Sequence, residues 1–328
     1  MRDIESAQDK SGLAYDVFNG DADGICALHQ LRLVYPLTAT LITGVKRDIR
    51  LLERVQASYG DQITVLDISL DANIAALNRH LDAGASILYF DHHTAKEARP
   101  HAHLKLFLDE APDVCTSILV SRYIGDRHFA WAIAAAFGDN LVDVAQSMCQ
   151  QSGLSQQQGE QLQMLGKLLN YNGYGEKIED LHIHPAALYR ALQPFVDPFE
   201  FIAESSEFTL LRKAYAADLA CVSELRPERE SKTAAMYVLP DEPWALRMSG
   251  VLANMLKQQS RDKSFAVLST KAEGGFIVSI RSAAPEHCPA STFCSGFATG
   301  GGRQSAGGIN HLADTDLEDF AQRFFAYF

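Results

Sequence analysis

The sequence predicts an α/β protein made of two domains and a connecting helix. Its 328 residues exceed the usual length of a single domain. Short apolar runs alternate with amphipathic stretches in the first part, as in βαβ units, and strands return after a long helical region. We therefore expect a mostly parallel sheet flanked by helices over residues 1–195, a linker helix over 196–232 and a smaller α/β domain over 233–328.

The elements of the first domain follow from the spacing of its apolar residues. Strands are expected over residues 15–18, 37–44, 63–66 and 87–90. Amphipathic stretches between them predict helices over 25–35, 49–59 and 74–81, the second of which carries Leu51, Leu52 and Val55 on one face.

Helical spacing dominates from Cys115 onward, and strand signals return near Thr233. Helices are expected over 116–123, 129–137 and 146–163, with one long helix over 199–225. The last domain is expected to hold strands over 234–239, 265–270 and 276–280, a helix over 250–259 and a glycine-rich loop over 300–308.

Composition limits the partners of the chain. A net charge of −12 argues against a broad basic surface that tracks long nucleic acid, whereas a small anionic substrate stays open because metal ions invert the field of an acidic pocket. No apolar run approaches the ~20 residues of a membrane helix, and the polar opening residues predict no signal peptide. Six scattered cysteines without a Cys-x-x-Cys pair indicate reduced thiols and a cytoplasmic protein.

Acidic residues and histidines follow three of the expected strands. Asp21 and Asp23 come after the first strand, Asp67 after the third, and the triplet Asp91-His92-His93 after the fourth. Open α/β sheets bind ligands outside the carboxyl ends of their strands, so this placement predicts a shared metal centre. The alternative for Asp21 and Asp23 is a solvated turn with helix-capping carboxylates.

The residue types also suggest roles at that centre. Asp67 is placed to bridge two cations ~3.5–4 Å apart. Neighbouring side chains on an extended segment point in opposite directions, so we assign His92 to the metal and His93 to the substrate or the leaving group. Asp139, after a small-residue helix, is the preferred further carboxylate, with Asp109 and Asp113 as competitors. Carboxylate and imidazole ligands favour Mn²⁺, with Mg²⁺ or Co²⁺ as alternatives.

Basic residues and glycines supply a second set of candidates. The backbone amides of Gly300, Gly301 and Gly302 could approach a phosphate closely, and Arg281, Ser282 and Arg303 lie near them in the expected domain. The alternative is a flexible hairpin. Lys46 and Arg47 follow the second strand and could contact a phosphate or lie in a solvated loop.

Taken in order, these motifs resemble the DHH phosphoesterase superfamily and its companion DHHA1 domain. That superfamily includes the RecJ exonuclease, nano-RNases, cyclic-dinucleotide phosphodiesterases and family II pyrophosphatases. The resemblance implies that His93 contacts the scissile phosphate and that Asp91 orients the histidines. It implies these metal ligands: Asp21, Asp23, Asp67, His92 and Asp139.

Two residues depart from the family pattern. Asn19 stands where many members have His or Asp, and its amide oxygen could ligate a hard cation without bringing charge. Arg303 replaces the histidine of the usual Gly-Gly-Gly-His, and arginine grips phosphate bidentately or stacks on a base.

The resulting expectation is a two-metal phosphodiesterase that hydrolyses short oligoribonucleotides or linear dinucleotides to mononucleotides. The alternatives are a cyclic-dinucleotide or 3′-phosphoadenosine 5′-phosphate hydrolase, and a non-catalytic nucleotide-binding regulator. The expected partner is a short RNA or dinucleotide, without long nucleic acid or membrane, and a homodimer is left open.

Overall fold

The computed structural model describes residues 12–95, 98–271 and 273–328. The prediction that there is no signal peptide rests mainly on residues 1–11, which lie outside the described residues. The chain forms two compact units: unit 1 runs to Gly173 and includes Ile183–Thr209, and unit 2 comprises Tyr174–His182 and Leu210–Phe328. The domain limits expected from the sequence stay predictions.

Unit 1 contains a five-stranded, fully parallel sheet in the order β2-β1-β3-β4-β5. The strands are β1 (Ala14–Phe18), β2 (Thr40–Thr43), β3 (Gln62–Leu66), β4 (Ser86–Asp91) and β5 (Leu104–Leu108). The sheet confirms the expected fold class, although strand β5 was not predicted. The strand order reverses between β1 and β3, and such a switch point is where doubly wound sheets bind their ligands.

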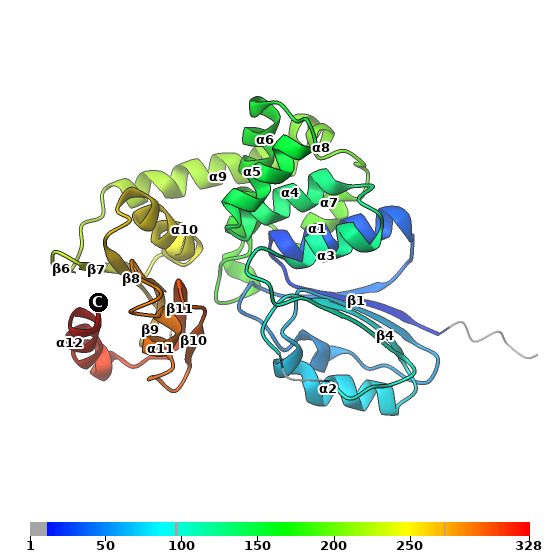
Figure 1. The fold of residues 1–328 in the computed structure, drawn as a ribbon, viewed down its shortest axis with the longest axis horizontal. Coiled ribbons are helices and arrows are strands. Elements are labelled where there is room, and N and C mark those ends of the chain that lie inside the picture. The colour runs from blue at the N-terminus through cyan, green and yellow to red at the C-terminus, as the bar shows by residue number, and fades with distance from the viewer. Residues whose placement is uncertain (1–11, 96–97, 272) are drawn as a thin grey trace, which may run out of the picture. The chain divides into compact units, whose positions relative to one another are not determined.

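Helices cover both faces of this sheet. Figure 1 shows α1 (Ala22–Val34) and α3 (Thr116–Tyr123) on one face and α2 (Leu70–Asp82) on the other. On the second face, α2 and the 3₁₀ helix η1 (Leu51–Arg54) pack against the sheet and enclose a core that includes Val65 and Tyr89. Because both faces are covered, β3 and β4 are nearly continuous apolar runs.

The remaining helices of unit 1 pack above α1. They are α4 (Phe129–Gly138), α5 (Val142–Gln151), α6 (Gln156–Asn172), α7 (Pro185–Leu192) and α8 (Pro198–Glu204). Helices α4 and α6 approach closely through glycine: a Cβ on Gly166 would lie 1.9 Å from the Ala134 carbonyl oxygen, and one on Gly138 would lie 2.8 Å from the Gly166 carbonyl oxygen.

Three helices expected from the sequence differ in the structure. Only η1 forms within residues 49–59, because the Asn73 side chain accepts from the Leu52 N–H and donates to the Ile49 carbonyl. The helix expected over 146–163 is two helices, α5 and α6, and Ser155 begins α6 with a capping box. The helix expected over 199–225 breaks at Ser205, so that α8 is followed by α9 (Ser206–Ser223), which carries the chain into unit 2.

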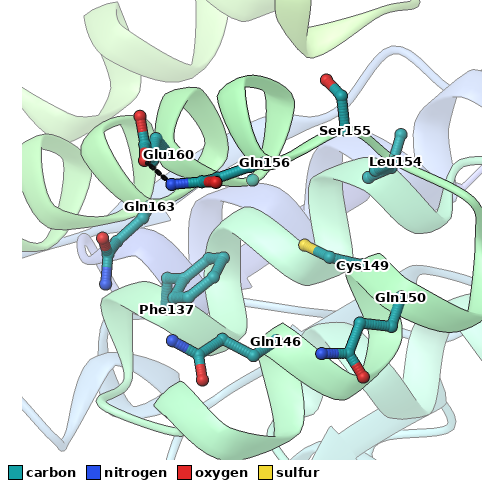
Figure 2. Close-up of a pocket in the computed structure, with 10 residues that line it drawn as sticks. Phe137, Gln146, Cys149, Gln150, Leu154, Ser155, Gln156, Glu160 and Gln163 are labelled. Atoms are coloured by element: carbon teal, nitrogen blue, oxygen red, sulfur yellow. Dashed lines mark hydrogen bonds between the residues drawn. The ribbon is translucent and has the colours of Figure 1, made fainter.

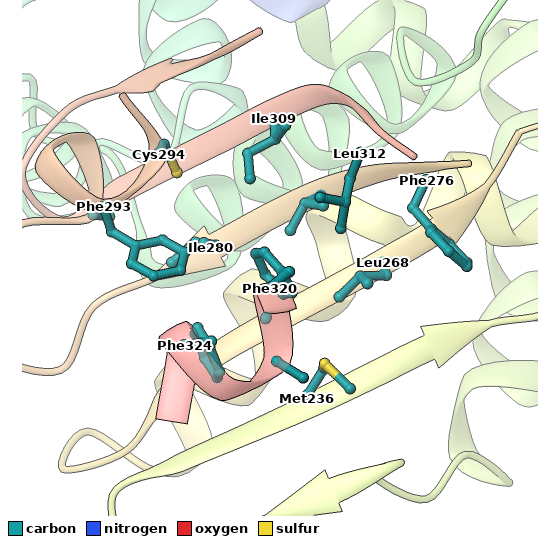
Figure 3. Close-up of a cluster of buried hydrophobic side chains, with 14 of the residues drawn as sticks. Met236, Leu268, Phe276, Ile280, Phe293, Cys294, Ile309, Leu312, Phe320 and Phe324 are labelled. Carbon is teal, nitrogen blue, oxygen red and sulfur yellow. The ribbon is translucent and has the colours of Figure 1, made fainter. Parts of the chain in front are cut away.

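Unit 2 contains a mixed six-stranded sheet in the order β10-β11-β9-β8-β7-β6. Its strands are β6 (Arg229–Glu230), β7 (Ala234–Leu239), β8 (Ser264–Thr270), β9 (Phe276–Arg281), β10 (Gly300–Gly302) and β11 (Ala306–Leu312), and its helices include α10 (Pro243–Gln259), α11 (Ala290–Cys294) and α12 (Leu317–Tyr327). Figure 3 shows Phe320 and Phe324 of α12 against Phe293 of α11 and the apolar face of the sheet. The glycine-rich segment forms the β10–β11 pair instead of the expected loop.

Within the described part of the chain, no helix combines the length and the apolar character that a membrane crossing requires. All six cysteines lie in that part, and each is a free thiol.

Candidate metal centre

Four segments that are distant in sequence converge at the switch point of the unit 1 sheet. The Nε2 atom of His92 lies 3.5 Å from Asp67 Oδ1, 3.8 Å from Asp139 Oδ2 and 3.9 Å from Asp23 Oδ2. Ligand atoms of Asp67, His92 and His93 lie within 4.8 Å of one another, close enough to share a metal ion. The structure thus brings the residues after β1, β3 and β4 together with the end of α4.

The orientation of His92 fixes which ring nitrogen faces the carboxylates. Its Nδ1 lies 2.9 Å from the Val114 carbonyl oxygen. Because a carbonyl only accepts, Nδ1 must carry the proton, and in the neutral ring the Nε2 lone pair is left facing Asp67. Metal-binding histidines are commonly held by such a contact, which sets the tautomer before the ion binds.

Asp91 holds the backbone and the second histidine in place. This carboxylate is completely buried, and its Oδ1 accepts from the N–H groups of His92 and His93 and from His93 Nδ1 at 2.7 Å. Its Oδ2 accepts from the N–H of Leu70 at the start of α2. Burial acts to lower the pKa of His93, but the hydrogen bond to Asp91 and the charges of Asp91 and Asp67 together outweigh it, and the pKa lies above its usual value.

Asp21 and Asp23 each cap a helix as well as face the centre. Asp21 Oδ1 accepts from the N–H groups of Asp23 and Gly24 at the start of α1. Both oxygens of Asp23 accept from the first N–H groups of α3, those of Thr116 and Ser117, at 2.7 Å. The capping interpretation of these residues and the metal interpretation are therefore compatible, because each carboxylate has further lone pairs.

Asp67 is the most strained and most crowded of the carboxylates. Its backbone lies in the left-handed region with φ 58°, which Asp tolerates better than most residues. Burial, followed by the charges of Asp23 and Asp21, raises its pKa well above the usual range. Burial also raises the pKa of Asp23. Positive charge from a cation would relieve this repulsion.

Two further oxygen atoms are available for a metal. Among the described residues, the buried Oδ1 of Asn19 and Oδ2 of Asp139 have no hydrogen-bond partner. Buried polar atoms are nearly always satisfied, and these two have lone pairs that a cation could use. The donor set of carboxylates, an amide oxygen and imidazoles therefore fits a divalent cation. The competitor Asp109 instead pairs with Arg122.

Two further polar residues lie at this centre: Lys46, which was predicted only as a possible phosphate contact, and Asn170, which was not predicted. Lys46 Nζ lies 2.5 Å from Asp21 Oδ2, 2.9 Å from Asn170 Oδ1 and 3.9 Å from Asp139 Oδ1. Burial acts to raise the pKa of Asp21, but the Lys46 ammonium and the hydrogen bond from the Gly24 N–H contribute to lowering it, and the pKa lies below the usual value. The position of Lys46 after β2 was the only sequence signal, and Asn170 on α6 gave none.

Two of the candidate residues of unit 2 form hydrogen bonds within that unit. The Arg281 guanidinium donates to Asn254 Oδ1 at 2.7 Å and to the Ile280 carbonyl. Ser282 is buried, and its hydroxyl donates to the Cys288 carbonyl at 2.7 Å. Both residues therefore take part in holding the end of β9 in place.

The glycines and Arg303 lie on the β10–β11 pair. A Cβ on Gly300 would lie 1.8 Å from the Cys294 carbonyl oxygen, and Gly302 has φ 141°, so packing and backbone require glycine at both positions. A Cβ on Gly301 would meet nothing within 4 Å. Gly301, Gly302 and Arg303 are exposed.

A separate cavity of about 430 Å³ lies between α5 and α6 in unit 1. Figure 2 shows its lining, in which Gln146, Gln150 and Gln163 surround Phe137 and Cys149. It contains none of the candidate site residues, so it is distinct from the metal centre.

No family model and no curated protein sequence matches the chain. Its fold does match solved structures. A DHH-domain protein described as a member of a family of ribosomal proteins gives a TM-score of 0.68 at 12% identity, with 97% of this chain and 86% of that chain covered. The exonuclease RecJ bound to manganese gives 0.60 at 18% identity, covering 97% and 90%.

A pGpG-specific phosphodiesterase, PggH from Vibrio cholerae, gives a TM-score of 0.56 at 15% identity, covering 96% of this chain and 100% of that one. At these identities the likeness is one of fold. The chain shares its fold with these DHH-domain, RecJ and PggH structures, as its motifs predict.

Proposed function

We propose that the chain is a metal-dependent phosphodiesterase that hydrolyses linear dinucleotides or short oligoribonucleotides to mononucleotides. The observation that carries the proposal is the convergence of Asp23, Asp67, His92 and Asp139 at the switch point of the parallel sheet. RecJ and PggH, which share the fold, are named as an exonuclease and a phosphodiesterase, and the RecJ structure contains manganese.

The residues at the centre have separable roles in this proposal. Asp67 and His92 would hold a divalent cation, with Asp21, Asp23, Asp139 and Asn19 as further ligands of the centre. Such ions lower the pKa of a bound water and neutralise charge on the phosphate. Mn²⁺ is the ion we expect, because the donor set mixes carboxylates with imidazoles.

His93 is the residue best suited to contact the substrate. Its side chain is 41% exposed, whereas those of His92 and Asp67 are 2% and 4% exposed. Its raised pKa favours the protonated ring, which can donate to a phosphoryl oxygen or to the leaving group. Asp91 is a positioning residue, since it contacts His93 and lies fully buried behind it.

A short substrate is favoured by charge. The chain carries −12 overall, which opposes the binding of long nucleic acid. Within unit 2, the exposed Arg303 and Gly301 could contact a terminal phosphate or base, and Arg281 and Ser282 would support them. A cytoplasmic location is part of the proposal, because free thiols are typical of reducing compartments.

The test is Mn²⁺-dependent hydrolysis of pGpG and pApA by the wild-type chain and by Asp67→Asn. Asparagine tolerates the left-handed backbone of this position, so the variant changes the ligand more than the fold. We expect kcat/KM to fall by at least about 100-fold. Asp82→Asn, an exposed carboxylate at the end of α2, is the matched control and should keep wild-type activity. Full activity of Asp67→Asn would refute the proposal.

Substrate class is tested with the same enzyme. Initial rates are compared on linear dinucleotides, their cyclic parents, 3′-phosphoadenosine 5′-phosphate and oligoribonucleotides from two to about ten nucleotides. We expect the linear dinucleotides to be hydrolysed fastest, and the rate to fall as the oligoribonucleotide becomes longer. A preference for the cyclic compounds or the bisphosphate would replace the proposed substrate but leave the metal centre in place.

A further inference from the structure

Lys46 lies inside the metal centre and not at its rim. Its Nζ is surrounded by three side-chain oxygens, those of Asp21, Asn170 and Asp139, at 2.5, 2.9 and 3.9 Å. Asp21 and Asn170 accept hydrogen bonds from the ammonium, and Asp139 lies at ion-pair distance from it. The side chain is 24% exposed, and its partner Asp21 only 3%.

Two carboxylates lie between this ammonium and the histidine cluster. Asp139 directs Oδ1 toward Lys46 and Oδ2 toward His92 Nε2. Asp21 binds Lys46 through Oδ2, and its charge also raises the pKa of Asp67. The centre therefore has two positions for positive charge that share Asp139: one at Asp67 and His92, and one at the Lys46 ammonium.

The backbone of Lys46 is fixed by neighbours on both sides. Its N–H donates to the Gly173 carbonyl at 2.8 Å, and its carbonyl accepts from Asn19 Nδ2 at 3.3 Å. A carboxylate or an unprotonated ring nitrogen at position 19 could not make the second contact. The Asn19 side chain and the backbone of Lys46 are thus connected by a hydrogen bond.

We propose that the ammonium of Lys46 takes the place of one of the two cations that the resemblance implies, so that the chain binds a single divalent cation at Asp67 and His92. This inference rests on the proposed metal-dependent function. Lys46 then supplies a fixed positive charge that neutralises Asp21 and Asp139, and Asn19 positions Lys46 through the hydrogen bond to its backbone carbonyl.

The experiment counts Mn²⁺ bound to the full chain. Protein is incubated with excess Mn²⁺, free ion is removed by gel filtration, and bound manganese is measured by atomic emission. Electron paramagnetic resonance separately distinguishes an isolated ion from a coupled pair. We expect one isolated ion per chain in the wild type and two coupled ions in Lys46→Gln. Lys105→Gln, an exposed lysine of β5, is the matched control and should bind one.

Each outcome decides the proposal. Two coupled ions in the wild type, or a single ion in folded Lys46→Gln, would overturn it while leaving the proposed function standing. No bound ion in any of the proteins would overturn the proposed function and this inference together. If Lys46→Gln does not fold, the wild-type count still decides, and Lys46→Arg, which keeps the charge, should also bind one ion.

Discussion

The close approach of α4 and α6 determines where Asp139 lies, and Gly166 is the residue that permits it. In Gly166→Ala the new Cβ would lie 1.9 Å from the Ala134 carbonyl oxygen, where ordinary contacts begin near 3.4 Å. The helices must therefore separate by about 1.5 Å. Overpacking of this kind costs about 1–3 kcal/mol of folding free energy.

The same displacement should reach the metal centre. Asp139 directly follows the last residue of α4, and its Oδ2 lies 3.8 Å from His92 Nε2. A shift of about 1 Å in a catalytic group can cost about 100-fold in rate. We therefore expect Gly166→Ala to lose stability in urea denaturation, and to lose Mn²⁺ affinity and hydrolytic activity.

Gly159 on the same helix provides the control. A Cβ there would lie 3.6 Å from Cys149 Sγ, which is ordinary contact. Gly159→Ala should be as stable as the wild type or up to about 1 kcal/mol more stable, because alanine favours helix. If the two alanine variants unfold at the same urea concentration, the close helix packing does not have the role assigned to it.

Two more predictions concern buried ionisable groups. Burial lowers the pKa of His29, whose Nε2 bonds the Phe195 carbonyl, to about 4. The unfolded chain therefore binds this proton first, and stability is lost as the pH falls from about 6.5 toward 4. Relative to His29→Gln, the wild type should lose about 2 kcal/mol between pH 7 and 5 in denaturant titrations; an unchanged difference would contradict this. Asp91→Asn removes the partner that raises the pKa of His93. The NMR titration midpoint of His93 in metal-free protein should move to lower pH, and an unmoved midpoint would show that Asp91 does not act through this ring.

The parts of the fold that the sequence predicts are those governed by local pattern. Strand ends follow from apolar runs, and parallel strands bring their carboxyl ends to one edge, so the meeting of Asp67 with His92 needed no knowledge of long-range contacts. The missed break at Ser205 was also local, since its hydroxyl caps α9 by accepting from the Glu207 and Phe208 N–H groups.

The parts that sequence reasoning missed depend on partners far along the chain. Asn73 replaces the helical hydrogen bonds expected near Leu52 from 21 residues away. Lys46 meets Asp21 across 25 residues and Asn170 across 124. A lysine after a strand is usually solvated, and it is the contacts with Asn170 and Gly173 at the end of α6 that make this one part of the site.

The two outermost strands of the unit 2 sheet are unusually small. β6 has two residues and β10 has three, and β10 consists of glycine alone. Edge strands this short present few unpaired backbone N–H and C=O groups to another chain, so the sheet is protected against the addition of further strands. Self-association of this unit would therefore have to proceed through side-chain contacts on its faces.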